Sequence, residues 1–315
     1  MILLWGLMAD TPMSMVHDEL EKAGAAFFFL DHRKIFSSDI EYTYSQETGT
    51  KCIVHFNGTC IDLDTITVAY VRPYNFRDYR EMEGKAFNDP MAEKAAGFEQ
   101  QLMSYLDASG AIVINKSDPS ATNNSKPYQL SVIRKAGLSI PETFISNDGS
   151  LVRRFLDKTG EAVYKSISGV RSIVHKVADA HLEFIEDVEW CPTLFQKVVP
   201  GVNYRAHVLK NEIYTVRIES DKLDYRYGQT TMVAEELPAE VAEKCYKLNA
   251  MLGLHFSGID LMRTDEDEWF CFEVNPSPAF SYFQLNSGLP ISAGLARFIM
   301  EMDLERRAAG LAIPL

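Results

Sequence analysis

The order of apolar and polar positions along the first third of the chain predicts strands that alternate with helices. Four short apolar runs are typical of buried strands, at residues 2–7, 26–30, 67–71 and 111–114. Helical spacing follows the first run over residues 12–22, and apolar positions three and four apart from Met91 to Tyr105 predict a helix with one buried face. This order indicates a small open α/β sheet flanked by helices.

A hairpin is predicted inside the same region. Two short strand-like runs, residues 52–56 and 60–63, are separated by Asn57-Gly58. Asn-Gly is a strong turn signal because both residues tolerate the positive φ that tight hairpin turns require. We therefore expect an antiparallel strand pair here.

A polar stretch, residues 115–126, is interpreted as a linker into a second unit. Ser125 and Asp148 are expected to cap the next two helices, because short polar side chains accept hydrogen bonds from the first helical amides. Later patterns predict strands at residues 162–167, 172–176, 193–199, 204–209, 212–219, 258–262 and 268–274, and helices at 238–252 and 290–303. A short mobile tail is expected from Arg306 on.

The composition excludes several classes of function. Lys and Arg number 31 against 44 Asp and Glu, and the resulting net charge of −13 excludes a global basic field for nucleic acid or an anionic membrane. No apolar run reaches the roughly 18 residues that a bilayer requires. The first residues lack the basic region of a signal peptide, so we interpret them as a buried strand. Five cysteines without a CxxC pair are typical of reduced thiols, which favours a soluble cytoplasmic protein.

Three oxygen-bearing side chains interrupt the two apolar strands near the end of the chain. Asp260 lies within the first strand, and Glu273 and Asn275 end the second. Residues i and i+2 of a strand face the same side, so Glu273 and Asn275 point together, and Asp260 joins them if the strands pair. Two carboxylates and an amide are ligands suited to Mg²⁺. The alternative is that Glu273 ends a strand in solvent and Asn275 begins a turn before Pro276.

Cations within predicted strands indicate anion binding. Lys165 lies in the middle of a strand, where a charge needs a partner, and residues 166–172 after it are small and polar enough to close over phosphates. Arg205 and Arg217, in adjacent predicted strands, can each meet phosphate or carboxylate with two hydrogen bonds. Exposed strand charge is the alternative. The chain contains neither a Walker loop nor a GxGxxG motif.

Residues 195–201 form a strand-like run that ends in the sharp turn Pro200-Gly201. Backbone exposed at such a turn can offer a carbonyl and an amide to an adenine edge. An ordinary edge strand is the alternative reading of the same residues.

Taken in order, these features resemble the ATP-grasp ligases. Lys126 after an Asn-rich turn, Lys165 before a Ser/Gly loop, the strand and turn at 196–201 and the acidic set from Asp260 to Asn275 follow the ATP-grasp order. The resemblance covers residues 112–303 and is close to the ribosomal-protein glutamate ligases and prokaryotic glutathione synthetases. Four segments look still more like the peptide-macrocyclising ligases of the microviridin (graspetide) type: Lys126-Pro-Tyr-Gln-Leu, residues 137–148, Tyr70-Val-Arg-Pro and Gly288-Leu-Pro-Ile-Ser.

The resemblance implies a mixed α/β (α+β ATP-grasp) fold. Its parts would be an N-terminal pre-ATP-grasp α/β domain at 1–115, a central lid at 116–195, a C-terminal subdomain at 196–305 and a tail at 306–315. The lid and the C-terminal sheet would hold ATP between them.

The resemblance also implies a role for each candidate residue. The α- and β-phosphates would be held by Lys126 and Lys165. Adenine and ribose would be contacted by Gln196, Lys197, Val199 and Asn203. Mg²⁺, for which Mn²⁺ can substitute, would be bound by Asp260, Glu273 and Asn275. The γ-phosphate and an acyl phosphate would be met by Arg205 and Arg217.

In such ligases ATP phosphorylates a carboxylate, and an amine or hydroxyl then displaces phosphate to give an amide or ester. We therefore expect an ATP-dependent ligase that modifies or cross-links a peptide or protein. The alternatives are a small-molecule amino-acid or glutathione-synthetase-like ligase and a non-catalytic nucleotide-binding regulator. A regulator would tolerate loss of metal and phosphate positions, and here the set is complete. Dimers and tetramers are common among relatives, which leaves a homo-oligomer open.

A segment rich in arginine and aromatic residues indicates where a peptide could dock. Its aromatic members are Tyr74, Phe76 and Tyr79, and its arginines are Arg72, Arg77 and Arg80. Such side chains are enriched where partners bind, and an acidic peptide would suit them. The alternative is that two of the aromatics pack inward while the arginines pair with Asp78, Glu81 and Glu83.

Overall fold

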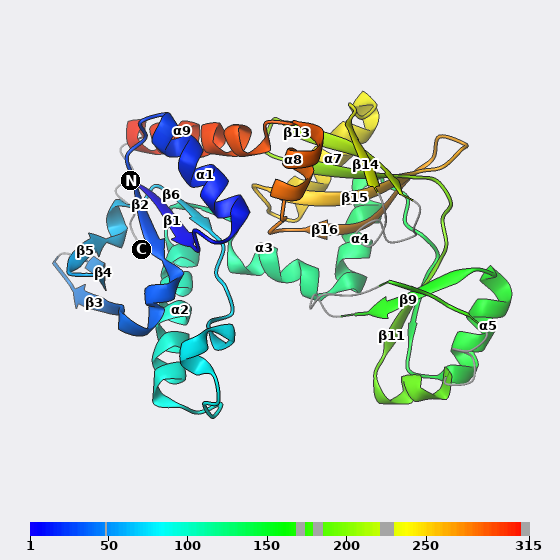
Figure 1. The fold of residues 1–315 in the computed structure, drawn as a ribbon, viewed down its shortest axis with the longest axis horizontal. Coiled ribbons are helices and arrows are strands. Elements are labelled where there is room, and N and C mark those ends of the chain that lie inside the picture. Colours follow the sequence, from blue (N-terminus) through cyan, green and yellow to red (C-terminus); the bar gives the residue numbers. More distant parts are fainter. Residues whose placement is uncertain (48, 168–173, 179–184, 221–229, 310–315) are drawn as a thin grey trace. The chain divides into compact units, whose positions relative to one another are not determined.

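Two units make up the chain in the computed structural model, which describes residues 1–47, 49–167, 174–178, 185–220 and 230–309 (Figure 1). The first unit contains Met1–Ser117, Ala279–Gln284 and the described residues from Pro290 on. The second contains Asp118–Pro278 and Leu285–Leu289. The structure therefore returns the end of the chain to the N-terminal unit, whereas the sequence placed it in a C-terminal subdomain.

A four-stranded parallel sheet forms the centre of the first unit, as the apolar runs predicted. Its strands lie in the order β2-β1-β6-β7, with bounds β1 Ile2–Gly6, β2 Phe27–Asp31, β6 Val68–Val71 and β7 Ile112–Ile114. Every residue of β1 is buried. Both faces of a parallel sheet must therefore be covered by helices.

Three helices cover this sheet: α1 Thr11–Lys22, α2 Pro90–Ala108 and α9 Ile291–Ala308. The α2 face with Phe98 and Leu102 packs against Leu3 and Trp5 of β1 in one hydrophobic core. In Figure 1, α1 and α9 lie together on the other side of the sheet. The first unit is thus a three-layer α/β arrangement.

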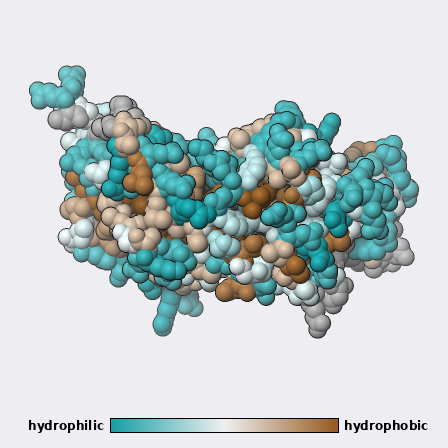
Figure 2. Space-filling model, turned by 90° about the horizontal axis from the view of Figure 1, so that it is seen from above, coloured by the Kyte–Doolittle hydropathy of each residue, from teal (hydrophilic) through white to brown (hydrophobic). Residues whose placement is uncertain are grey.

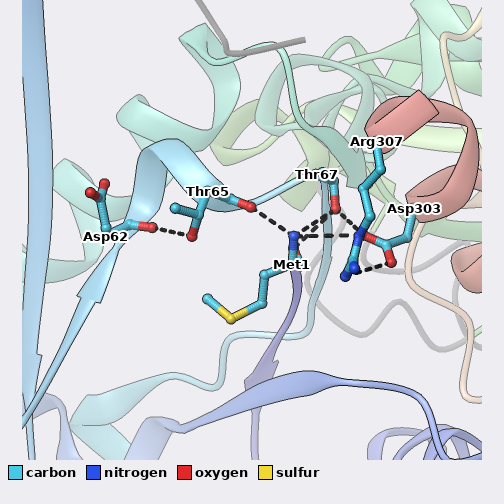
Figure 3. A network of polar contacts seen from close by, with 6 residues as sticks. All are labelled: Met1, Asp62, Thr65, Thr67, Asp303 and Arg307. Carbon is cyan, nitrogen blue, oxygen red and sulfur yellow. Dashed lines mark hydrogen bonds and ion pairs between the residues drawn. The ribbon is translucent and has the colours of Figure 1, made fainter. Parts of the chain in front are cut away.

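A buried carboxylate ties α9 to the start of the chain (Figure 3). Asp303 accepts a hydrogen bond from Thr67 Oγ1 and pairs with Arg307 Nη2 at 2.9 Å. The Met1 ammonium lies 3.6 Å from the same carboxylate and donates to the Thr65 carbonyl at 2.7 Å. Desolvation lowers the pKa of this amino group. Because α9 continues to Ala308, residues 306–308 are helical, although the sequence predicted a tail there; residues 310–315 lie outside the described residues.

A small antiparallel sheet lies between β2 and β6 in the sequence. Its strands are β3 Asp39–Ser45, β4 Gly49–Phe56 and β5 Thr59–Asp62, in that order. The predicted hairpin is confirmed, with Asn57 at φ 48° and Gly58 at φ 75°. The sequence analysis missed β3, although Ile40, Tyr42 and Tyr44 alternate with polar residues along it; most of its residues are exposed.

An antiparallel sheet in the order β10-β9-β11-β8 forms the first part of the second unit. Its bounds are β8 Thr143–Ser146, β9 Ala162–Ser166, β10 His175–Lys176 and β11 Thr193–Lys197. Helix α5, Gly149–Thr159, packs Val152 and Phe155 against Phe195 of β11. The boundary predicted at 195/196 falls inside β11, because all of this strand pairs within the one sheet.

A five-stranded antiparallel sheet in the order β14-β13-β12-β15-β16 forms the rest of the second unit. Its bounds are β12 Val202–Val208, β13 Ile213–Ser220, β14 Thr230–Ala234, β15 Ser257–Arg263 and β16 Trp269–Asn275. Two helices, α4 Lys126–Ala136 and α7 Ala239–Met251, pack on one face through a shared core. The segment predicted as a linker holds the short helix α3, Ser117–Ala121, and a second short helix, α8, spans Ser281–Ser287.

Hydrophilic side chains cover most of the face shown in Figure 2, with apolar residues between them. None of the helices within the described ranges is long and apolar enough to cross a bilayer.

Candidate functional site

The three predicted metal ligands lie on one face of the five-stranded sheet. Asp260 of β15 is paired with Glu273 of β16, and Gly258 is paired with Asn275 two positions away. Directly paired residues of antiparallel strands share a face, so the two carboxylates and the amide project together. This face is opposite to the one that packs on α4 and α7.

A β-bulge brings Glu273 to this face. Asp260 pairs with Glu273 but Leu261 pairs with Cys271, so Phe272 is an extra residue on β16. Cys271 and Val274 both belong to the buried core on the helix face. Without the bulge, Glu273 would share the face of Cys271, two residues earlier.

Each carboxylate of the set lies beside a buried cation. Lys126 Nζ lies 3.4 Å from Glu273 Oε1, and Arg205 Nη1 donates to Asp260 Oδ1 at 2.6 Å. Lys126 is the first residue of α4, and Arg205 lies on β12 directly opposite Asp260. Two cations and two carboxylates therefore meet beside β15 and β16, a charge pattern that can accept a divalent metal together with phosphate.

The absence of a side chain at Gly258 leaves the space that the Arg205 guanidinium occupies. A Cβ at this position would lie 2.3 Å from Arg205 Nη2 and 2.6 Å from Cζ, both too close for a real contact. The guanidinium therefore crosses directly over the Gly258 backbone to reach Asp260. Glycine is needed here for close approach, since its φ is not in the positive range.

Two further residues of β12 share the face of Arg205. Asn203 is half-buried and paired with Met262, and His207 is fully buried. Desolvation lowers the pKa of His207 well below its usual value, and the nearby Arg205 charge lowers it further. His207 is therefore neutral at physiological pH.

The structure does not bring Arg217 to Arg205. Arg217 is paired with Tyr204, which packs in the core on the helix face, so the two arginines project from opposite faces of the sheet. Arg217 Nε donates to Glu235 at 2.7 Å, and Nη1 pairs with Glu219. These contacts, that to Glu219 first, raise the pKa of the guanidinium. The adjacency of the two strands was predicted, but the register places the side chains apart.

The predicted nucleotide residues Lys165 and Gln196 lie on the four-stranded sheet of the second unit. Lys165 of β9 is 6% exposed and is paired with Leu194, on the face away from α5. Gln196 is buried on the same face, and its Nε2 donates to Thr143 Oγ1 at 2.9 Å. Of the phosphate-closing loop predicted at 166–172, residues 168–172 lie outside the described residues.

Strand β11 is central in its sheet, so the reading of residues 195–201 as an edge strand is wrong. The Lys197 and Val198 amides donate to the Glu142 and Glu161 carbonyls at 2.9 and 3.0 Å. Val199 is half-buried and follows the last of these hydrogen bonds. The backbone that leaves the sheet therefore begins at Val199.

The three candidate substrate arginines of the first unit have different surroundings. Arg72 follows β6 and its Nε donates to Asp10 at 2.5 Å, in a nearly buried ion pair. Arg77 lies over the Phe87 ring at 4.2 Å and donates to the Phe87 carbonyl at 3.1 Å. Among the described residues, neither Arg77 nor Arg80 lies within 4 Å of a carboxylate.

The aromatic residues of this segment divide between core and surface. Phe76 is buried and Tyr79 packs against the core, as the packing alternative predicted. Tyr74 is 47% exposed and stacks on Tyr79, and Phe87 is 82% exposed. Two arginines and two aromatic rings thus remain at the surface.

Gln129 lies in the Lys126-Pro-Tyr-Gln-Leu segment, but the sequence did not identify it as a candidate site residue. It lies one turn after Lys126 on α4 and is 2% exposed. Its Nε2 donates to the Val274 carbonyl at 2.8 Å, and its Oε1 accepts from the Val274 amide at 2.9 Å. Its spacing from Lys126 was the only signal in the sequence.

No protein-family model and no curated protein matches the chain. Solved structures do. The ATP-grasp ligase PsnB, complexed with a phosphomimetic variant of minimal precursor, Mg and ADP, is 25% identical at a TM-score of 0.79, over 96% of this chain and 98% of that one. The macrocyclase MdnC from Microcystis aeruginosa, bound with precursor peptide MdnA, is 20% identical at a TM-score of 0.79, over 96% and 100%.

A third similar structure is a RiPP-associated ATP-grasp ligase from Chryseobacterium gregarium, in complex with ADP and a leader and core peptide. It is 20% identical at a TM-score of 0.81, over 95% of this chain and 96% of that one. The chain therefore has the ATP-grasp fold, as predicted, and resembles the graspetide ligases along nearly its whole length.

Proposed function

We propose that this protein is an ATP-dependent ligase that modifies a peptide by joining one of its carboxylates to an amine or hydroxyl. The observation that carries the proposal is the row formed by Asp260, Glu273 and Asn275, with Lys126 and Arg205 beside the two carboxylates. The similarity to ligases solved with ADP, Mg and precursor peptides supports the same reading.

The donor set fits Mg²⁺, with Mn²⁺ as a substitute. Asp260, Glu273 and Asn275 supply hard oxygen atoms on one sheet face, and none of the three is fully buried, so phosphate oxygens and water can complete the shell. When bound, the metal would neutralise charge on the nucleotide phosphates. With the carboxylates bound to a metal, Lys126 and Arg205 would be free to bind phosphate oxygens.

The proposed nucleotide site combines the two sheets of the second unit. Lys126 and Lys165 would hold the α- and β-phosphates. The base and ribose would be contacted by Gln196, Lys197, Val199 and Asn203. Because the Gln196 side chain donates to Thr143 and its backbone lies in a strand paired on both sides, the backbone from Val199 on is the better adenine contact.

The reaction would pass through an acyl phosphate. A carboxylate oxygen of the peptide attacks the γ-phosphorus, the bond to the β-phosphate bridge oxygen breaks, and ADP leaves. An amine or hydroxyl then attacks the acyl carbon and expels phosphate, with loss of its proton. We propose that Arg205 meets the transferred phosphoryl group, since Arg217 lies on the opposite face.

For the peptide, we propose docking at the surface around Arg77 and Arg80 in the first unit. Within the described ranges neither arginine has a carboxylate within 4 Å, and this, with the exposed rings of Tyr74 and Phe87, favours an acidic partner. Arg72 is less available because it is paired with Asp10. A cytoplasmic location is proposed because all five cysteines are free thiols.

The test is peptide-stimulated release of ADP. Glu273→Ala is expected to abolish Mg²⁺-dependent turnover while the protein stays folded; thermal unfolding is measured beside turnover, because the change also removes the carboxylate beside buried Lys126. Glu266→Ala, in the exposed turn between β15 and β16, is the control. Unchanged turnover in Glu273→Ala at saturating Mg²⁺ contradicts the metal assignment.

The docking surface has its own test. Arg77→Ala with Arg80→Ala is expected to abolish stimulation by an acidic peptide while the basal affinity for ATP is kept. If a free amino acid stimulates as strongly as any peptide, the small-molecule reading is correct instead.

A further inference from the structure

Strand β16, which carries two of the three proposed metal ligands, is the edge strand of its sheet. Among the described strands β15 alone pairs with it along a ladder, an isolated bridge joins Phe270 to Ser139, and the bulge at Phe272 interrupts the ladder directly before Glu273. A bulge leaves one residue unpaired and weakens the local ladder. The backbone that sets the directions of Glu273 and Asn275 therefore has its weakest ladder pairing directly beside these two ligands.

Two contacts on the outer side of β16 bracket this bulge. Before it, the Cys271 amide donates to the Ser139 carbonyl at 2.8 Å. After it, the Gln129 side chain makes its two hydrogen bonds with the amide and carbonyl of Val274. A carboxamide carries one acceptor and two donors, so it presents to Val274 what the peptide group of a neighbouring strand would present.

Val274 is the residue between the two ligands and is fully buried. Fixing both its polar groups fixes the peptide planes on either side, which set the directions of the Glu273 and Asn275 side chains. Lys126, three residues before Gln129, contacts Glu273 from the same helix. Residues three apart lie on one helix face, so a single rigid element touches β16 at both points.

We infer that Gln129 is a positioning residue for the metal site, holding Glu273 and Asn275 in register with Asp260. The inference rests on the proposed function, because it takes these three residues as metal ligands. It adds that the geometry of the site is set from outside the sheet, by the helix that begins with the phosphate-binding Lys126.

The experiment uses Gln129→Glu, which keeps the shape of the side chain. An ionised carboxylate still accepts from the Val274 amide but faces the Val274 carbonyl without a donor. Protonation restores an O–H donor, and burial raises the pKa of such a carboxyl group. Mn²⁺ affinity, measured by electron paramagnetic resonance with a non-hydrolysable ATP analogue, is expected to fall about 10- to 100-fold at pH 8 and to recover toward the wild-type value near pH 6.

The matched control is Asn249→Asp. Asn249 is another buried amide of the second unit, on α7, and its Nδ2 donates to the Leu254 carbonyl at 3.0 Å. This variant is expected to lower stability and to leave Mn²⁺ affinity within twofold of wild type. Equal losses of affinity in the two variants, or a wild-type affinity in Gln129→Met, which lacks both polar groups, would overturn the inference.

A second measurement separates this inference from the proposed function. Hydrogen exchange of the peptide that contains Val274, in metal-free protein, is expected to accelerate in Gln129→Glu at pH 8 but not in Asn249→Asp. If wild type binds no Mn²⁺–nucleotide, the proposed function and the inference both fail, whatever the exchange shows. If Gln129→Glu does not fold, Gln129→Met, which lacks both polar groups, replaces it with the same expected loss at all pH values.

Discussion

A single methyl group added at Gly258 is expected to disable the site without disturbing the fold. The Cβ of Gly258→Ala would lie 2.3 Å from Arg205 Nη2 and 2.6 Å from Cζ. The guanidinium must therefore move, and because Arg205 is only 5% exposed, its side chain has little room in which to do so. Alanine itself is not strained there, because φ at this position is not positive.

The size of the effect follows from the contact that is lost. Arg205 donates to Asp260 at 2.6 Å, and a hydrogen bond between charged groups contributes about 1.5–3 kcal/mol. If the displaced guanidinium no longer meets the transferred phosphoryl group, the same energy is lost from the transition state. The expected fall in kcat/KM is about 10- to 150-fold.

The assay is ADP release with saturating peptide, measured beside thermal unfolding. Gly97→Ala is the matched control, since Gly97 lies within α2, has non-positive φ, and a Cβ there meets nothing within 4 Å. Its helix should gain about 0.5–1 kcal/mol, with turnover unchanged. Wild-type kcat/KM in folded Gly258→Ala would refute the reasoning, because Arg205 would then not need this position.

Three other predictions concern binding, thiol chemistry and pH. Lys165→Met should weaken ATP binding about tenfold or more, with little change in the unfolding midpoint, because the phosphate contact is lost while the apolar stem is kept; unchanged affinity contradicts a phosphate role. Cys60 should react with iodoacetamide faster than the other exposed thiol, Cys191, because His55 Nδ1 lies 3.3 Å from its Sγ, and His55→Asn should remove the difference; equal rates in the wild type contradict this. The free energy of unfolding should fall as pH drops from 7 to 5, because His207 binds a proton near pH 6.5 in the unfolded chain but stays neutral in the folded protein, where burial lowers its pKa. A free energy of unfolding in urea that does not change across this range argues against it.

Features that depend on neighbouring residues were predictable from the sequence. Gly137 ends α4 in the left-handed region at φ 98°, and Asp148 accepts from the Ser150 and Leu151 amides at the start of α5. Ser125 occupies the predicted N-cap of α4 but makes no side-chain cap hydrogen bond. Caps require only a few adjacent residues, so local patterns identify their positions, though not always their contacts.

The candidate site was predictable only in part, because two of its features depend on strand register. The spacing of Glu273 and Asn275 correctly placed them on one face. The same rule would have put Cys271 beside them, and only the bulge at Phe272 separates it. For Arg217 the prediction was wrong for the same reason. Its pairing with Tyr204 turns its side chain to the face opposite Arg205, and no local sequence pattern predicts that pairing.

The return of α9 to the first unit has a consequence for the order of folding during synthesis. The hydrogen bond between Thr67 and Asp303 joins residues 236 positions apart, and the helix that carries Asp303 buries Leu295 and Ile299 beside the parallel sheet. The second unit, by contrast, is almost entirely one continuous segment, Asp118–Pro278. During synthesis, all residues of the second unit therefore leave the ribosome before α9, the last helix of the first unit. Although its sheet is made first, the first unit completes its fold last, and until then the face that α9 will cover stays open to solvent or to a chaperone.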